Sequence, residues 1–423
     1  MKIGVLGGGG REHALQWTLA KSPHATVVHC LPGNGGTIHG VPLDPCDLDA
    51  VAQACRDLDL DLLVVGPEAP LAAGIVDRMA ASSTRVFGPT QAAARLESSK
   101  LFAKAFMRRH GIPTAEFTEL RGPEDLASAF DRFGSAVLKA DGLASGKGVV
   151  VCRNAAELEA AWHYVQSLRP SGERFLAEAC LEGWELSVMI LTDGETWRAF
   201  PASQDHKPLL DGDRGPNTGG MGAFCPVPAC SHDLMHSIEE SVIRPTLAGL
   251  RADGLPYRGF LYFGLMLTAD GPQLLEYNVR LGDPEAEALL SALDSDLCEA
   301  IVASLDGGLA DVDLRFSTDF FVDVVLASPG YPGTCEIGHA VSHLAMPVER
   351  PDRGGRVFHG ATKLQDGLSM TAGGRVLHVV GSAPTLDEAI ARTYDTVKQV
   401  AFDGAVYRGD IGQRLNRLVS EGR

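Results

Sequence analysis

The feature that most constrains this chain is a rhythm of short apolar runs that each end in a glycine-containing loop. Residues 2–6, 26–30 and 62–65 have the apolar character of buried strands, and stretches of helical periodicity separate them. The loops that follow these runs are 7–10, 32–36 and 66–67. This alternation predicts an open parallel α/β sheet, in which ligands bind at the carboxyl ends of the strands.

The pattern changes further along the chain. One helix is expected from residue 90 to about Arg109, because Gly111 and Pro113 follow it. From residue 136 onward the runs suggest strands in hairpin-like pairs, and a hairpin is expected over the turn Ala269-Asp270-Gly271. The runs concerned are 136–140, 148–152, 174–178, 185–191, 260–268 and 273–278. A long helix at 232–251 and a β-rich last part, with strands at 320–327 and 375–380 and a closing helix at 386–400, complete the expected order.

Length and charge limit the class of protein. At roughly 150 residues per domain, 423 residues correspond to about three domains. The net charge of −17 disfavours general binding to nucleic acid, although a local site can still hold a small phosphorylated molecule. No apolar stretch approaches the roughly 20 residues that a membrane span needs. The nine cysteines form no Cys-x-x-Cys pair, so we expect reduced thiols and a cytoplasmic protein.

Two glycine-rich loops are candidate phosphate sites. In the first, residues 7–12, a dinucleotide fingerprint would need its third glycine where Glu12 stands, which disfavours an NAD-linked oxidoreductase. The turn is either a simple tight turn or an anion site at a helix start, and Arg11 favours the second interpretation. The other loop, residues 141–149, joins two strands and is not a Walker A loop. It is either a flexible hairpin tip or a phosphate lid, and Lys139 beside it favours a lid.

Three further segments carry polar groups suited to ATP chemistry. Glu276, Asn278 and Arg280 alternate along one expected strand, so they project to one face. Carboxylate and amide oxygens suit Mg²⁺, and an arginine suits a transferred phosphoryl group, whereas the alternative is an ordinary solvated sheet face. Residues 178–185 resemble an inter-domain hinge, whose backbone can bond adenine while Glu185 bonds a ribose. Residues 213–222 are too polar and too glycine-rich for a core, which favours a functional loop.

Taken together and in this order, the motifs resemble one family, the phosphoribosylamine–glycine ligases (glycinamide ribonucleotide synthetases). The runs that carry the resemblance are Gly8-Gly-Gly-Arg-Glu-His-Ala-Leu15, Pro32-Gly-Asn-Gly-Gly-Thr37, Val65-Gly-Pro-Glu-Ala-Pro-Leu71, Lys139-Ala-Asp-Gly-Leu-Ala-Ser-Gly-Lys-Gly-Val149, Ser203-Gln-Asp-His-Lys207, Gly215-Pro-Asn-Thr-Gly-Gly-Met-Gly222, Asn278-Val-Arg-Leu-Gly-Asp-Pro-Glu285 and Arg408-Gly-Asp-Ile-Gly-Gln-Arg414. The resemblance covers the whole chain.

The resemblance implies a multidomain α/β and α+β protein. It would consist of an N-terminal open parallel α/β substrate-binding domain (1–100), the small lobe of an ATP-grasp core with a glycine-rich lid (101–190), the large lobe with the metal site (191–318) and a small β-rich C-terminal domain (319–423). The implied reaction is the ligation of glycine to 5-phosphoribosylamine through glycyl phosphate, with ATP cleaved to ADP and phosphate, as a step of purine synthesis. Both substrates are small molecules, and we expect a monomer without nucleic-acid or membrane partners.

The resemblance also assigns residues. ATP would be held by Lys100, Lys139, Asp141, Gly142, Ser145, Gly146, Lys147, Gly148, Glu178, Ala179, Cys180, Leu181 and Glu185. The substrates would be held by Gly9, Gly10, Arg11, Glu12, Gly33, Asn34, Gly66, Pro67, Glu68, Asp213, Asn217, Thr218, Gly219, Gly220, Met221, Gly222 and Arg280. Glu276 and Asn278 would hold Mg²⁺ or Mn²⁺, and the catalytic residues would be Arg280, Lys139 and Asp213.

The chain departs from the family pattern at two places. Ala179 stands where the adenine hinge usually carries a second acid, and Phe358-His-Gly-Ala-Thr-Lys363 inverts the usual order Ala-Gly. Neither removes a catalytic group. Two rivals remain open besides the oxidoreductase: an ATP-grasp ligase for another acid or amine, and an ATP-binding regulatory protein without turnover. Residues 8–15 and 215–222 argue against the first, and the set Lys139, Glu276, Asn278 and Arg280 argues against the second.

Overall fold

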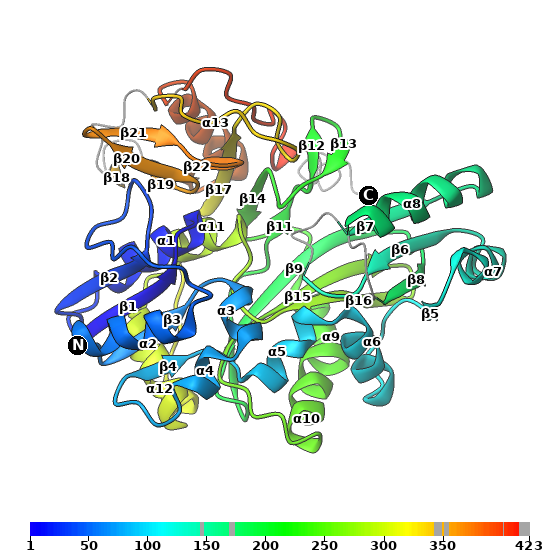
Figure 1. Ribbon diagram of the computed structural model, residues 1–423, viewed down its shortest axis with the longest axis horizontal. Coiled ribbons are helices and arrows are strands. Elements are labelled where there is room, and N and C mark those ends of the chain that lie inside the picture. Colours follow the sequence, from blue (N-terminus) through cyan, green and yellow to red (C-terminus); the bar gives the residue numbers. More distant parts are fainter. Residues whose placement is uncertain (144–147, 169–173, 342–348, 351–354, 401, 414–423) are drawn as a thin grey trace.

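A computed structural model of the protein shows an N-terminal parallel sheet, two antiparallel lobes and a C-terminal sheet (Figure 1). The structure describes residues 1–143, 148–168, 174–341, 349–350, 355–400 and 402–413. Within these residues, no helix combines the length and the apolar character that crossing a membrane requires. The multidomain architecture agrees with the fold class expected from the sequence.

The N-terminal sheet has the strand order β2-β1-β3-β4, and all of its strands are parallel. Its strands are β1 (Lys2–Gly7), β2 (Val27–Pro32), β3 (Leu62–Val65) and β4 (Arg85–Phe87), and the helices between them are α1 (Gly10–Leu19), α2 (Leu48–Asp57), α3 (Glu68–Ala73) and α4 (Ile75–Arg78). The first three strands and their glycine loops were expected from the sequence. The fourth strand was not, because three residues are too few to show a period of two.

The helix expected from residue 90 to Arg109 is wrong in one respect, because Ser99 divides it. The structure has α5 (Gln91–Ser98) and α6 (Lys100–Arg109), and Ser99 between them is extended, with φ −141° and ψ 109°. The Ser99 hydroxyl accepts a hydrogen bond from the N–H of Phe102 at 3.2 Å. A serine that caps the next helix in this way competes with continuation of the first. The break places Lys100 at the start of a helix.

The small lobe is an antiparallel sheet in the order β5-β8-β6-β7. It consists of β5 (Phe117–Leu120), β6 (Ala136–Ala140), β7 (Val149–Cys152) and β8 (Phe175–Ala179), with α7 (Pro123–Phe133), the short helix η1 (Ala155–Glu157) and α8 (Leu158–Leu168). The two α-helices contact β6, and their apolar side chains share one core with the sheet. One face is therefore covered by helices, which leaves the other face to the cleft described below.

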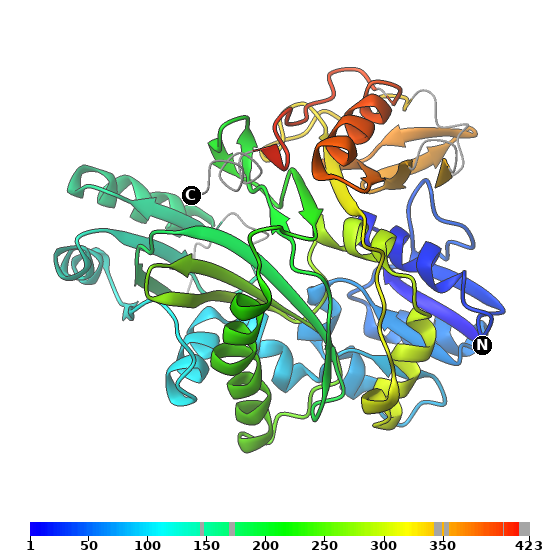
Figure 2. The same cartoon turned by 180° about the vertical axis from the view of Figure 1, so that it is seen from behind.

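The large lobe is a second antiparallel sheet, in the order β10-β9-β15-β16. It consists of β9 (Trp184–Thr192), β10 (Trp197–Ala199), β15 (Gly259–Thr268) and β16 (Gly271–Asn278), so β15 and β16 form the expected hairpin. The helical run α9 (His232–Ile238), the π-helical turn η2 (Glu239–Ile243) and α10 (Arg244–Ala252) crosses one face of it (Figure 2). The expected long helix is thus present with a π turn at its middle, and the boundary expected at residue 190 falls inside β9.

The C-terminal sheet includes two strands from the middle of the chain. Its order is β11-β14-β17-β22-β19-β18, from β11 (Gln204–Asp205), β14 (Gly222–Cys225), β17 (Phe320–Ala327), β22 (Arg375–Ala383), β19 (Gly355–His359) and β18 (Glu349–Arg350). The remaining elements are the hairpins β12 (Pro208–Leu210) with β13 (Arg214–Asn217) and β20 (Thr362–Gln365) with β21 (Leu368–Thr371), and the helices α11 (Glu285–Ala292), α12 (Leu297–Asp306), η3 (Leu309–Asp311) and α13 (Leu386–Val397). This shared sheet joins the two antiparallel lobes to the C-terminal part.

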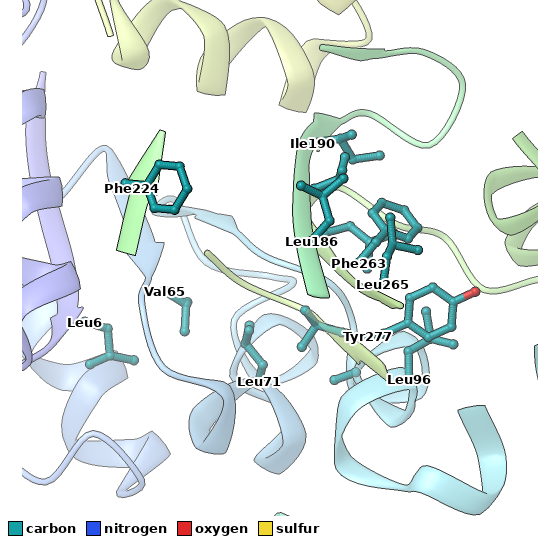
Figure 3. Packing of buried hydrophobic residues seen from close by; sticks show 14 of the residues in the cluster. Leu6, Val65, Leu71, Leu96, Leu186, Ile190, Phe224, Phe263, Leu265 and Tyr277 are labelled. Carbon is teal, nitrogen blue, oxygen red and sulfur yellow. The ribbon is translucent and has the colours of Figure 1, made fainter. Parts of the chain in front are cut away.

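Three clusters of buried apolar side chains lie against these sheets, and one of them contains side chains of the large lobe. Figure 3 shows Phe263 and Leu265 of β15 beside Leu186 of β9, with Tyr277 of β16 close by. The Phe263 and Tyr277 rings have centroids 5.7 Å apart in an edge-to-face arrangement. The Tyr277 hydroxyl lies 2.8 Å from the hydroxyl of Thr246 in α10, so the buried polar group is satisfied. This packing fixes β16, whose other face carries the predicted metal ligands.

Replacement of Phe263 by alanine tests this core. Phe263 is 0% exposed, so Phe263→Ala should lower the free energy of unfolding by about 3–5 kcal/mol, through lost burial and the cavity left behind. Urea unfolding followed by tryptophan fluorescence measures the change. Leu364→Ala is the matched control, because Leu364 is 66% exposed and its loss should change stability little. Equal losses in the two variants would contradict the assigned core.

Candidate functional site

A cleft of about 720 Å³ lies between the two lobes. All four parts of the fold line it: Arg11 and Glu68 from the N-terminal part, Lys139 from the small lobe, Glu276 from the large lobe and Arg375 from β22. Clefts between domains are common positions for ligands, because several elements contribute polar groups there. The protein carries a net charge of −17, yet lysines and arginines gather along this cleft. Carboxylates line the cleft in equal number, so an anion can bind there beside the cations that these acids hold in place.

One end of the cleft is apolar. Its lining includes Met107, Val137, Val149, Val151, Met266, Leu275 and the segment of Ala179, Cys180 and Leu181. The segment follows β8 directly and leads into β9, so it lies where the chain passes from the small lobe to the large one. An apolar slot bordered by free backbone groups can hold a flat heterocycle through contact area and a few hydrogen bonds. This end of the cleft fits adenine.

A buried carboxylate fixes two lysines beside this apolar end. Glu178 of β8 lies 2.8 Å from Nζ of Lys104 in α6 and 2.8 Å from Nζ of Lys139 in β6. Burial lowers the pKa of Lys104 to about 8, although the Glu178 carboxylate favours the charged amine. Burial opposes the charge on Glu178, but Lys139 and Lys104 outweigh it and hold its pKa below the usual value. One anion thus positions two cations.

The loop after β6 is anchored to the start of α6. The carboxylate of Asp141 accepts from the Ser99 hydroxyl at 3.1 Å and from the N–H of Leu101 at 3.2 Å. The Lys100 ammonium donates to the carbonyl of Gly142 at 2.8 Å. The base of the expected lid is therefore fixed in the structure, while the predicted residues Ser145, Gly146 and Lys147 lie outside the described residues. Gly148, at the other end of the loop, lines the cleft.

Strand β16 presents a carboxylate and an amide to the cleft, as its alternation predicted. Glu276 and Asn278 line the cleft, and the ring of Tyr277, which alternates with them, is buried in the core on the opposite face. The Asn278 amide donates to Oε1 of Glu97 at 2.9 Å, which turns its oxygen away from that acceptor. Burial disfavours the charge on Glu276, but Lys207 outweighs it, with Lys139 and Lys100, and keeps its pKa below the usual value. Two oxygen donors side by side are consistent with a hard divalent cation.

Lys207 and Arg280 are held by acids around this pair. The Lys207 ammonium lies 3.0 Å from Glu185 and 3.8 Å from Glu276. The Arg280 guanidinium lies 2.8 Å from Glu97 and 3.3 Å from Glu68. Burial raises the pKa of Glu97 to about 7, although Arg280 favours its charged form. Two acids from separate segments therefore fix the direction of one guanidinium.

The N-terminal glycine turn is held by its own acid. Glu12 accepts from the N–H of Gly9 at 2.6 Å and from Nε of Arg11 at 2.6 Å. The N–H of Gly9 is therefore already bonded, which differs from the free anion-binding N–H expected at this turn. Arg11 reaches the cleft, and its Nη1 donates to the carbonyl of Leu281 at 3.2 Å. Arg11 is the group of this turn that can meet an anion in the cleft.

Neighbouring loops support that turn. The Asn34 amide donates to the carbonyls of Gly8, Gly9 and His359 at 3.1, 3.2 and 2.6 Å. A Cβ on Gly66 would overlap the Glu12 side chain, whose Cδ would lie at 2.7 Å. Arg375 of β22 donates to the carbonyls of Gly219 and Asp283 at 2.6 and 2.7 Å. These contacts tie the substrate side of the cleft to the C-terminal sheet.

The structure brings many of the predicted residues to one cleft, but not all of them. Those that line it are Arg11, Pro67, Glu68, Lys100, Lys139, Gly142, Gly148, Glu178, Ala179, Cys180, Leu181, Glu185, Asn217, Thr218, Gly219, Glu276, Asn278 and Arg280. The predicted residues that are not part of its lining are Gly9, Gly10, Glu12, Gly33, Asn34, Gly66, Asp141, Gly220, Met221 and Gly222. Asp213 is placed elsewhere: it lies 3.0 Å from Arg408, in the turn between β12 and β13.

Several lining residues were not assigned from the sequence. They are Glu97, Lys104, Asp205, Lys207, Asp283, Glu285, Tyr331 and Arg375. Lys104 follows Lys100 by one helical turn, a spacing that places both on one face and could have indicated it. Asp205 and Lys207 alternate within a run that carried the family resemblance. Arg375 had no local indication, because only the pairing of β22 with β17 brings it near the cleft.

Comparison with known proteins identifies three family domains along the chain. Family models of phosphoribosylglycinamide synthetase match residues 1–97 (N domain), 98–286 (ATP-grasp A domain) and 321–414 (C domain). The phosphoribosylamine–glycine ligase of Ralstonia nicotianae is 46% identical over 427 residues, covering 99% of this chain and 100% of that protein. The trifunctional purine biosynthetic protein adenosine-3 of Gallus gallus is 45% identical over 433 residues. This chain spans 43% of its length.

Solved structures agree in fold. The crystal structure of phosphoribosylamine–glycine ligase from Thermotoga maritima has a TM-score of 0.84 and 36% identity, covering 97% of this chain and 100% of that one. A biotin carboxylase from Campylobacter jejuni has a TM-score of 0.70 and 15% identity, covering 96% of this chain and 92% of that one. The second likeness concerns the fold alone.

Replacement of Gly10 by alanine tests the close packing behind the glycine turn. A Cβ there would overlap the carboxylate of Glu287 and lie 2.6 Å from Nε2 of His378. Alanine normally stabilises a helical position relative to glycine, by roughly 0.5–1 kcal/mol. Gly10→Ala should instead lower the free energy of unfolding by about 1–3 kcal/mol, because neither neighbour can retreat. Chemical denaturation measures it, and Gly308→Ala is the control, since the nearest atom there is 3.9 Å away. A stabilising Gly10→Ala would contradict this packing.

Proposed function

The chain belongs to the phosphoribosylglycinamide synthetase family, and we propose that it joins glycine to 5-phosphoribosylamine with cleavage of ATP to ADP and phosphate. The product would be glycinamide ribonucleotide, an intermediate of purine synthesis, and the enzyme is a carbon–nitrogen ligase. The observation that carries the proposal is the joint position of Lys139, Glu276, Asn278 and Arg280 in one cleft. These residues provide the cationic, metal-binding and phosphoryl-binding groups that the reaction needs.

The two ends of the cleft divide the substrates between them. Adenine fits the apolar end beside Ala179, Cys180 and Leu181, and Glu185 lies where a ribose hydroxyl can donate to it. Lys100 and Lys139 are the cations for the phosphates, because both line the cleft and Lys100 bonds the base of the glycine-rich loop at Gly142. Glycine and phosphoribosylamine occupy the end bordered by Arg11, Glu68 and the loop 217–219. Arg280, between Glu68 and Glu97, faces the junction of the two ends.

The residues of β16 fit a divalent cation. Glu276 offers a charged oxygen, Asn278 offers a neutral one, and both face the cleft that would hold ATP phosphates. Such a set leaves room for waters and phosphate oxygens, which suits Mg²⁺ or Mn²⁺. When bound, the cation would supply positive charge against the negative charge that develops on the ATP phosphates. ATP with a divalent metal is usual for ATP-grasp enzymes, and the choice between the two ions is our proposal.

The protein's own contribution is position, charge and exclusion of water. Glycine's carboxylate oxygen attacks the γ-phosphorus of ATP, so one P–O bond forms and the bond to ADP breaks. The amine of phosphoribosylamine then attacks the acyl carbon, and phosphate leaves. Arg280 neutralises the transferred phosphoryl group, and its two acids hold it in place before substrates arrive. Lys100 fixes the base of the lid through Gly142, so that a closing loop can shield the acyl phosphate.

Other expectations stay predictions. Asp213 was expected to be catalytic, but its ion pair with Arg408 gives it a place in the β12–β13 turn instead of the cleft. We propose that this hairpin positions the loop 217–219 rather than taking part in chemistry. A cytoplasmic location and a monomeric state remain as expected from the sequence.

A substrate-omission assay tests the proposed reaction. ADP release from ATP and Mg²⁺ should require both glycine and freshly prepared phosphoribosylamine, because either omission stops turnover. A coupled assay for ADP, with each substrate left out in turn, measures this requirement. ADP release that needs glycine but accepts another amine would change the proposed amine substrate and leave the proposed ATP chemistry intact. Release in the absence of glycine would contradict the acyl-phosphate route.

Glu276→Gln tests the assignment of the metal site. The substitution keeps the shape of the side chain but removes its charge, so turnover should fall by about 10²-fold or more and the concentration of Mg²⁺ needed should rise. Steady-state rates across a Mg²⁺ titration measure both effects, and the circular dichroism spectrum should stay unchanged. Glu195→Gln is the control, because Glu195 is exposed and lies outside the cleft lining. Normal turnover at low Mg²⁺ would rule out this metal site.

A further inference from the structure

A buried group of charged side chains lies behind the substrate end of the cleft. It consists of His378 in β22, Asp323 in β17, Glu287 in α11 and Asp283 in the loop before α11, and we call it the histidine cluster. The side chains of His378, Glu287 and Asp323 are at most 1% exposed, whereas that of Asp283 is 12% exposed and lines the cleft. The proposed reaction gives no role to the first three. Their cost in desolvation requires an explanation.

Both ring nitrogens of His378 face carboxylates. Nδ1 lies 2.9 Å from Oδ2 of Asp323 and 3.4 Å from Oε1 of Glu287. Nε2 lies 3.8 Å from Oδ1 of Asp283. A neutral imidazole would direct a lone pair at one of these acids, whereas an imidazolium directs an N–H at each side. The geometry therefore corresponds to a doubly protonated ring.

The charges around the ring agree with this state. Burial alone would lower the pKa of His378, but Glu287, Asp323 and Asp283 outweigh it and raise the pKa to about 9. Burial also raises the pKa of Glu287 and of Asp323, and the charge on His378 opposes this rise at both acids. Asp283 stays charged, because Arg375 and His378 outweigh its burial and lower its pKa to about 2. Arg375, on the same strand, lies 3.0 Å from Asp283. His13 of α1, the other ionisable neighbour, stays neutral, because burial lowers its pKa to about 3.

The cluster acts on the substrate side through Asp283. A Cβ on Gly9 would lie 3.6 Å from Oδ2 of Asp283, so this carboxylate rests against the glycine turn. Arg375 connects Asp283 to the carbonyl of Gly219 in the neighbouring loop. We propose that protonated His378 is a positioning residue, which holds Asp283 and Arg375 in the arrangement that binds the hydroxyl-bearing amine substrate. The identity of that amine as phosphoribosylamine rests on the proposed function.

A metal ion is the rival occupant of the cluster. Single ligand atoms of Asp283, Glu287 and His378 lie within 4.8 Å of one another, a spacing that could hold a cation. Two contacts argue against it. Oδ1 of Asp283 already faces the Arg375 guanidinium at 3.0 Å, and Nδ1 of His378 faces two acids at once. A cation there would be repelled by the Arg375 guanidinium and would have to displace the proton on Nδ1, so the imidazolium is the better fit.

His378→Gln tests the proposal by the pattern of its kinetic effects. The variant keeps hydrogen-bonding capacity but loses the charge, so KM for phosphoribosylamine should rise about tenfold, the scale of one charge-assisted hydrogen bond. KM for ATP should stay within about twofold, because the ATP end of the cleft is unchanged. His232→Gln is the matched control, since His232 is exposed on α9. Equal changes in both KM values would show a general structural effect and overturn the proposal.

The pH dependence gives a second readout. Because the pKa of His378 is raised in the folded protein, its charge is present at neutral pH and is lost as the pH rises through about 9. KM for phosphoribosylamine in the unsubstituted enzyme should therefore rise above pH 9, and the rise should be absent in His378→Gln. The ring signal of His378 in an NMR titration should report the same pKa without any turnover. A pKa near 6.5 or lower would overturn the proposal even if the ligase activity is confirmed.

Charge compensation separates the remaining alternatives. The double variant His378→Gln with Asp323→Asn removes one charge of each sign, so it should restore most of the affinity for phosphoribosylamine. A metal site would behave in the opposite way, because the second substitution removes another group that supports the ion. Metal analysis of the purified enzyme completes the test. One tightly held metal ion per chain that is lost in His378→Gln would show that the cluster binds a metal, and it would overturn the proposal of an imidazolium.

Discussion

The ion pairs of Glu178 with Lys104 and Lys139 are the interaction on which the ATP end of the cleft depends. One buried anion faces two buried cations. A buried ion pair contributes little to net stability, since desolvation of the charges offsets their attraction. The contribution of this ion pair is to orientation, because it fixes two ammonium groups from α6 and β6 relative to one strand. An incoming polyphosphate then meets charges that are already oriented, and little reorganisation is needed.

The substrate end depends in the same way on strand β22. Arg375 bonds the carbonyls of Gly219 and Asp283, and His378 supports the Asp283 carboxylate from behind. The C-terminal part is therefore more than a cover, because two cations on one of its strands arrange loops that belong to the other parts. The shared sheet, in which β14 pairs with β17 and β17 with β22, holds that strand at a fixed distance from the cleft.

Local patterns in the sequence predicted what is local in the structure. Alternation placed Glu276 and Asn278 on one face of β16, and the apolar rhythm predicted the parallel N-terminal strands. The predictions that failed did so because tertiary contacts decide the structure at those positions. Ser99 interrupts a helix because its hydroxyl caps the next helix and also bonds Asp141, which is distant in sequence. Asp213 turns to Arg408 for a similar reason, and Arg375 enters the cleft only through strand pairing. Side chains whose partners lie 42 to 195 residues away, as here, leave no periodic trace in the sequence.

The cations and acids of the cleft are paired with each other before any ligand binds. Lys207 lies between Glu185 and Glu276, and Arg280 lies between Glu68 and Glu97. Binding of ATP with a divalent cation would give each charged side chain a new partner with the same charge as the old one. Glu276 would exchange an ammonium for the metal, and Lys207 would exchange a carboxylate for a phosphate. Such an exchange avoids leaving a charge unpaired in a dry site, which would cost several kcal/mol. It also explains how so acidic a protein can build an anion site, since Lys207 and Arg280 are kept in place by acids that the ligand can replace.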